Sequence, residues 1–172
     1  MARSSRNLLL CALTPPDYGL LEPHLTKIEF SIRQGFEEAN KPIEHVYFPE
    51  NGIVSIVAKS QHEQAEAAIV GLEGMTGIPV VLGNDRWVND TYVQVEGSGF
   101  QIAANDLRRA IAKGANLRGI LLAFTQAFVV QTTQTALANA RGNVEMRLAR
   151  CLLMAHDRLN GNDLPLSMNS WL

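Results

Sequence analysis

The sequence lacks the motifs that usually mark a metal centre or a thiol-based active site. Neither an HxH nor an HExxH pattern occurs, and the two cysteines, Cys11 and Cys151, lie far apart without a CxxC pair. The four histidines are scattered: His24, His45, His62 and His156. Metal sites need several such ligands at short spacing. We therefore expect no metal, no cofactor and no catalytic residues, and we interpret both cysteines as buried, reduced thiols of a cytoplasmic protein.

An excess of charge of either sign is also missing. Lys and Arg number 15 and Asp and Glu 17, which leaves a net charge of -2. This argues against nucleic-acid binding by the chain alone, because such binding rests on neutralising phosphates. With 172 residues and 47% hydrophobic content, the chain fits one ordinary domain with a short appendage. The start, MARSSRNLLLCAL, has too short an apolar run and no clear cleavage site for a signal peptide.

Helix-breaking and charged residues are absent from a long stretch near the C-terminus, residues 117–139. Between Arg118 and Arg141 there is no charged residue and no proline, and Gly119 is the single glycine. Nothing local interrupts a helix there. A membrane span is disfavoured, because the stretch contains seven Thr and Gln side chains that would each have to be satisfied in hydrocarbon.

This predicted helix is apolar on more than one face. One seam has the spacing of a helix that packs on a partner: Leu117, Leu121, Phe124 and Phe128. Four further apolar residues fall off that seam: Ile120, Leu122, Val129 and Val130. We predict a dimer through the seam, with a buried core helix of a monomer as the alternative.

The region before residue 104 alternates between short apolar runs and turn residues. Strands are predicted over 28–32, 45–48, 53–58, 61–70, 92–95 and 100–102, with a turn at Gly97 and Gly99. Thr14 is predicted to cap a short helix, Asn105 a second that ends at Gly114, and Asn143 a third. Short strands separated by turns predict a β-sandwich or a jelly-roll barrel. With the helices, we predict an α+β fold: a double-stranded β-helix (jelly-roll) barrel with flanking helices and a long C-terminal dimerisation helix.

Three segments carry a resemblance to a known family: KPIEHVYFPENGIVSIVA, GLEGMTGIPVVLG and ARGNVEMRLARCLLMAHDRL. From about Asn7 to Leu166 the chain resembles the Crp/Fnr family of bacterial transcription regulators. The resemblance implies a cyclic-nucleotide-binding-like sensor barrel in residues 1–114 and a dimerisation helix in 115–141. It also implies that 142–172 is a remnant of a winged helix-turn-helix domain without its recognition helix, so DNA would be bound only through a missing C-terminal domain.

The chain departs from the family at the residues that bind cyclic nucleotides. Members that bind them carry Gly-Glu in the loop for the ribose, and an Arg further along for the phosphate. Here Met75 stands at the Glu position and Asn89 at the Arg position, with Asp90 beside it. A thioether does not replace a carboxylate, and an amide carries no charge for the phosphate. Binding of cyclic AMP in the usual mode is therefore not expected.

Two groups of candidate ligand-binding residues follow, each with an alternative interpretation. The loop carries Gly71, Glu73, Gly74, Met75 and Gly77, and its three glycines either cradle an anion with their N–H groups or allow tight turns at the barrel corners. Asn89 and Asp90 join this group by the alignment above. Thr132 and Thr133 correspond to hydroxyls that touch the nucleotide base in the family, or else they set the dimer register. Glu63 and Glu66 are expected to face solvent.

The function that these patterns and the resemblance predict is a sensor and dimerisation module, not an enzyme. We expect a homodimer that binds a small-molecule effector or a partner and does not enter a membrane. One alternative is a cupin-like jelly-roll enzyme, which would want clustered His and Glu ligands inside the barrel. Another is a truncated regulator that acts by pairing with a full-length relative.

Overall fold

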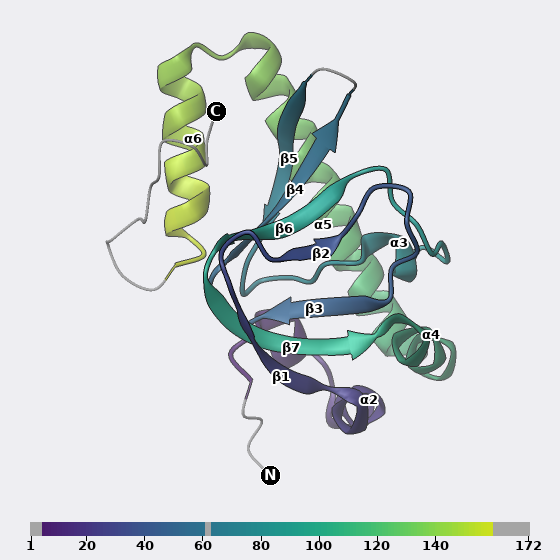
Figure 1. The fold of residues 1–172 in the computed structure, drawn as a ribbon. Helices are drawn as coiled ribbons and strands as arrows, with labels where there is room; N and C mark the ends of the chain where they lie inside the picture. The colour runs from purple at the N-terminus through teal and green to yellow at the C-terminus, as the bar shows by residue number, and fades with distance from the viewer. Residues whose placement is uncertain (1–4, 61–62, 160–172) are drawn as a thin grey trace.

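Two antiparallel sheets face each other in the computed structural model, which describes residues 5–60 and 63–159 (Figure 1). The first sheet has the order β1-β7-β3, with β1 at Thr26–Phe30, β7 at Gly97–Ala103 and β3 at His45–Pro49. The second has the order β2-β6-β4-β5, with β2 at Gly35–Glu37, β6 at Asp90–Val95, β4 at Ile53–Lys59 and β5 at Gln64–Val70. Strands distant in sequence pair in both sheets, so the predicted jelly-roll fold is confirmed.

Helices flank this barrel at its two ends and along one side. Before β1 lie α1 (Leu8–Cys11), α2 (Pro15–Leu21) and a 3-10 turn, η1 (Glu22–His24). Between β5 and β6 lies α3 (Ile78–Val81), and after β7 follow α4 (Ala104–Lys113), α5 (Ala115–Arg141) and α6 (Val144–His156). The predicted caps hold at two starts, because Thr14 accepts a hydrogen bond from the Asp17 N–H and Asn143 from the Met146 N–H.

The long helix α5 runs along the barrel and turns the predicted dimer seam toward its own chain (Figure 1). Leu117 and Leu121 are fully buried in the main core, and Phe128 is 7% exposed. The assignment of Leu117, Leu121 and Phe128 to the dimer interface is therefore corrected, since these three side chains already pack inside one chain. Phe124 is half-buried on the same side. With two apolar faces available, the barrel covers the face with the larger side chains, which removes more apolar surface from water.

By length and composition, α5 is the one helix among the described residues that is apolar enough to cross a membrane. Its packing against the barrel does not favour a membrane span. One side lies on the barrel, and the Thr125 hydroxyl, buried on that side, donates to the Leu121 carbonyl. We interpret α5 as a helix that completes the core of the barrel.

Three predictions about local structure are wrong. Gly97 and Gly99 lie inside β7, not in a turn: a side chain at Gly97 would meet Asn51, and one at Gly99 would meet the Phe48 carbonyl, so the glycines allow close strand pairing. Asn105 was predicted to cap a helix, but the helix begins at Ala104 and already includes Asn105. Cys11 is exposed and Cys151 half-buried, whereas both were expected to be buried.

Three short elements, α1, α3 and β2, have no counterpart in the prediction. Each has four residues or fewer, too few for a periodic signal. The predicted end of the helix at Gly161 and Asn162 and the start of the strand predicted from Gln61 lie outside the described residues.

Candidate ligand-binding site

The glycine-rich loop of residues 71–77 connects β5 to α3 and is held by buried side chains from distant parts of the chain. Asn7 is fully buried, and its amide nitrogen donates to the Gly74 carbonyl at 2.8 Å and to the Pro49 carbonyl at 2.7 Å. Thr76 pairs with Tyr47 twice, since its N–H donates to the Tyr47 carbonyl at 2.9 Å and its hydroxyl accepts from the Tyr47 N–H at 3.1 Å. These contacts position the loop without a ligand.

The Gly77 N–H, a predicted donor to a bound anion, already donates to a carboxylate of the same chain. Glu37, on β2, is 8% exposed, and it accepts hydrogen bonds from the Gly77 N–H at 2.6 Å and from the Thr91 hydroxyl at 2.9 Å. Burial raises the pKa of the Glu37 carboxyl, against the hydrogen bonds from Thr91, Thr76 and Gly77. An anionic ligand at Gly77 would have to displace this carboxylate.

The three loop glycines each serve a geometric need. Gly77 has φ +70°, in the left-handed region that glycine adopts without strain. Gly74 lies directly under the ring of Phe124, and a Cβ atom at Gly71 would lie 2.8 Å from Cγ of Arg158. Of the two interpretations of these glycines, tight turns and close packing are the one that the contacts support.

Met75, the residue at the family's Glu position, is a core residue. It is fully buried and packs in the main core cluster with Leu10, Val46 and Phe48. Its inclusion among the candidate ligand-binding residues is therefore corrected, because a side chain with no exposed surface contacts no ligand in this conformation.

Asn89 and Asp90 lie at the start of β6, where Asp90 is engaged by other groups. Its carboxylate pairs with Lys59 and accepts from the Ala39 N–H at 2.7 Å. Burial alone would raise the pKa of Asp90, but the hydrogen bond and charge of Lys59, together with the Ala39 N–H, outweigh it and lower the pKa. Asp90 borders a surface groove of about 560 Å³ that Glu37, Glu44 and Tyr47 also line.

The α5 side chains that approach the loop are aromatic and not the predicted threonines. The Thr132 hydroxyl donates to the Phe128 carbonyl at 2.9 Å and the Thr133 hydroxyl to the Val129 carbonyl at 2.8 Å, so both protons are used inside the helix. Phe128 packs with Trp87 at a ring distance of 5.9 Å and fills the space between helix and barrel. Phe128 belongs to a hydrophobic cluster whose other buried members are Ile56, Ala68, Val70 and Ile78.

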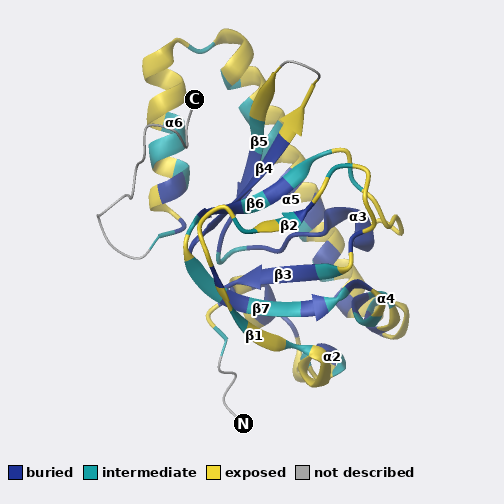
Figure 2. Cartoon of the chain, in the orientation of Figure 1, coloured by how far each residue is buried: buried dark blue, intermediate teal, exposed yellow. Residues whose placement is uncertain are grey.

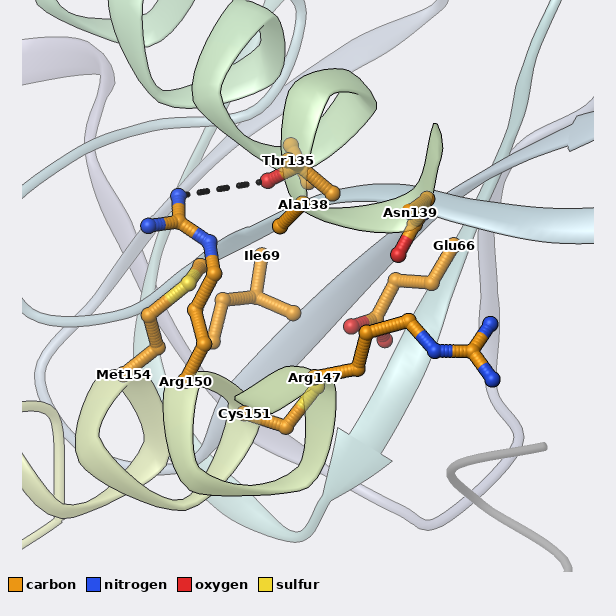
Figure 3. Close-up of a pocket in the computed structure, with 10 residues that line it drawn as sticks. Glu66, Ile69, Thr135, Ala138, Asn139, Arg147, Arg150, Cys151 and Met154 are labelled. Carbon is orange, nitrogen blue, oxygen red and sulfur yellow. Dashed lines mark hydrogen bonds between the residues drawn. The ribbon is translucent and has the colours of Figure 1, made fainter. Parts of the chain in front are cut away.

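A second crevice, which the sequence did not suggest, lies between β5, the end of α5 and α6 (Figure 3). Its volume of about 20 Å³ suits a single water molecule. Glu66, Arg147 and Cys151 project into it from β5 and α6.

Glu66 is half-buried, which corrects the expectation that it faces solvent, whereas Glu63 is exposed as expected. The Ser55 hydroxyl donates to Glu66 at 2.7 Å. Burial raises the pKa of Glu66 to about 7, against hydrogen bonds from Ser55 and Gln94 and the charge of Arg158. Residues from the end of α5 and from α6 line the same crevice, so no local pattern around Glu66 could have revealed its burial.

Comparison of the sequence with protein-family models and with curated proteins finds no match. The fold, however, matches solved structures. The c-di-GMP responsive global regulator CLP of Xanthomonas campestris is similar over 88% of this chain and 77% of its own, with TM-score 0.68 and 15% identity. FixK2 from Bradyrhizobium japonicum is similar over 85% and 74%, with TM-score 0.69 and 18% identity.

A catabolite activator protein from Thermus thermophilus is similar over 77% of this chain and 62% of its own, with TM-score 0.58 and 14% identity. At these identities the likeness concerns the fold. The described residues have the fold of the cyclic-nucleotide-binding-like sensor domains of Crp/Fnr regulators, followed by the long helix α5.

Proposed function

We propose that this chain is the sensor and dimerisation module of a cytoplasmic Crp/Fnr-type transcription regulator, and not an enzyme. We place the sensor barrel in residues 1–114, the dimerisation helix in 115–141 and a helix-turn-helix remnant in 142–172. The observation that carries the proposal is a barrel of this fold joined to a helix whose second apolar face is uncovered.

That second face of α5 is formed by residues off the predicted seam. Leu122 is 38% exposed, Val129 and Val130 are each 51% exposed, and Leu137 is 53% exposed. Figure 2 shows much of α5 as exposed where it faces away from the sheets. Several exposed apolar side chains on one face of a helix of 27 residues are typical of a surface that a partner covers. We therefore propose that the homodimer forms through this face.

The residues of the loop 71–77 argue against cyclic AMP bound in the usual way, and they favour a different effector. Met75 offers no carboxylate, and Glu37 already holds the Gly77 N–H. Ligand binding would instead favour surfaces that remain open, such as the groove beside Asp90 and Tyr47.

The oligomeric state tests the proposal directly. Sedimentation velocity of the 172-residue protein should show a dimer, and Val129→Glu should convert it to a monomer, because a charge buried without a partner is costly. Leu82→Glu is the matched control, since Leu82 is 61% exposed but lies after α3. A monomeric parent protein, or a Val129→Glu variant that stays dimeric, would contradict the proposal.

The cupin-like enzyme is the less favoured function. Among the described residues, no group of three or more His, Cys, Asp or Glu side chains is placed to hold a metal ion. Metal analysis of the purified protein tests this point. A stoichiometric bound transition metal would favour the enzyme.

DNA binding by this chain alone is not proposed. The net charge of -2 gives no sequence-independent attraction to the phosphate backbone. A gel-shift assay at physiological salt should therefore show no sequence-selective retardation, and selective retardation would reveal a DNA-binding surface on this chain.

A further inference from the structure

An ion pair joins the glycine-rich loop to the end of α6, across 85 residues of sequence. Nε of Arg158 donates to Oε1 of Glu73 at 2.7 Å, and Nη1 of the same guanidinium donates to the Met154 carbonyl at 2.8 Å. The Arg158 side chain is 10% exposed and the Glu73 side chain 34%. Charges this far from solvent are screened less than a surface pair, and removal of one partner leaves the other uncompensated.

The loop is shaped to receive Arg158. A Cβ atom at Gly71 would lie 2.8 Å from Cγ and 2.9 Å from Cβ of Arg158, so the side chain passes directly over this glycine. The Gly71 N–H also donates to Oε1 of Glu73 at 3.3 Å, which orients the carboxylate. The contact therefore combines steric fit and charge at one point of the loop.

The rest of α6 is held weakly. Ala155 is buried against Ile53 and Ile69, while the guanidinium of Arg150 reaches the Gln131 carbonyl and the Thr135 hydroxyl only at 3.4 Å. Four large apolar side chains of the helix are at least half exposed: Val144, Met146, Leu148 and Leu153. In Figure 2 the half of α6 next to α5 is mainly exposed, and the buried positions lie toward its other end.

The connection to α5 suits a hinge. Gly142 and Asn143 have extended backbones, with ψ 141° and 171°, and separate the two helices. The Gly142 N–H donates to the Ala138 carbonyl and the Asn143 carbonyl accepts from the Arg147 N–H, so rotation about the bonds between these two groups can reorient α6 while the hydrogen bonds of both helices are kept.

We propose that the Glu73–Arg158 pair is a latch that holds α6 against the sensor barrel, and that a change in the loop of residues 71–77 releases α6 about Gly142 and Asn143. The loop also lies against Phe124 of α5 through Gly74. Through the latch, a change in the barrel alters the position of α6, a helix whose outer face is apolar and uncovered. This goes beyond the proposed function, because it concerns movement of α6 and not the dimer or the effector.

Cys151 provides the readout, since it lines the crevice that α6 closes over β5. Burial raises the pKa of its thiol, as does the nearby Glu66, against Arg150 and Arg147. In a Cys11→Ser background, which removes the exposed thiol, Cys151 of the latched protein should react slowly with a thiol reagent. Glu73→Gln should raise the rate about tenfold, because the loss leaves the Arg158 charge unpaired.

A second variant opens the latch by shape alone. Gly71→Ala keeps every charge but places a methyl group against the Arg158 side chain, and it should also raise the Cys151 rate. The matched controls are Glu29→Gln, at an exposed carboxylate of β1, and Gly35→Ala, where a Cβ atom meets nothing within 4 Å. Both controls should leave the rate unchanged.

Hydrogen exchange separates release of α6 from general destabilisation. In Glu73→Gln, faster exchange confined to α6 supports the latch, with the dimer still intact by sedimentation. Equal acceleration in α6 and in β4 and β7 would overturn it, because the pair would then only stabilise the whole fold. An unchanged Cys151 rate in both Glu73→Gln and Gly71→Ala, or a fully reactive Cys151 in the parent protein, would overturn it as well.

Discussion

The ring of Phe124 in α5 lies so close over the backbone of Gly74 that a Cβ atom at this glycine would overlap the ring. The long helix and the glycine-rich loop are therefore packed in direct contact. In this conformation an aromatic side chain occupies the surface that Gly74 presents to the helix.

Replacement of Gly74 by Ala should destabilise the protein by about 1–3 kcal/mol, because an added methyl group overpacks a filled site. Urea unfolding measures the change in the free energy of unfolding. In a Phe124→Ala background the same replacement should cost much less, since the ring it would strike is gone. Equal costs in the two backgrounds would show that the contact with Phe124 is not the cause.

The raised pKa of Glu66 predicts a pH dependence of stability. Its pKa rises from the usual 4.5 to about 7 in the folded protein, so the native state holds the proton more tightly than the unfolded chain. The stability from this group is fully present below pH 4.5 and is lost as the pH rises through about 7. At about pH 8, Glu66→Gln should exceed the parent protein in stability by up to about 3 kcal/mol.

Near pH 4.5, the usual pKa of this carboxyl, the Glu66→Gln variant and the parent protein should have similar stability. Thermal unfolding across this range measures the difference, with Glu63→Gln as the exposed control from the same region. Parallel curves for the parent and Glu66→Gln would show that Glu66 titrates normally.

The two faces of α5 should respond differently to truncation. Leu121→Ala removes a fully buried core side chain and should cost about 2–5 kcal/mol in the free energy of unfolding, with the dimer affinity unchanged. Val129→Ala should weaken the dimer and cost little in the stability of the chain, because Val129 is half exposed. Denaturation and sedimentation equilibrium on both variants measure the stability of the chain and the dimer affinity. If Leu121→Ala weakened the dimer and Val129→Ala did not, the dimer interface would be the seam predicted from sequence.

Cyclic AMP at about 1 mM should leave the melting temperature unchanged, since a ligand stabilises only in proportion to its binding to the native state. Installing the missing carboxylate should not rescue binding. Met75→Glu places a charge in the core, where Met75 has no exposed surface, so the variant should lose stability and gain no affinity. Calorimetric micromolar binding to the parent protein would show that the loop binds nucleotide in another conformation.

The sequence alone determined the elements whose causes are local. The stretch between Arg118 and Arg141 has no charge or proline to interrupt a helix, and α5 spans it. Thr14 and Asn143 cap helices because their side chains satisfy N–H groups two or three residues away. The order of short strands and turns was enough to predict the jelly-roll fold.

Tertiary structure decided which surfaces meet. Both faces of α5 are apolar, so periodicity could not say which one would cover the barrel, and the structure buries Leu117, Leu121 and Phe128 of the predicted seam inside the chain. The roles of Gly71 and Gly74 depend on Arg158 and Phe124, which lie far along the chain. The raised pKa of Glu66 comes from burial, which depends on how the distant segments around β5 pack. Local patterns determine backbone conformation over a few residues, whereas burial and charge pairing depend on contacts between distant segments.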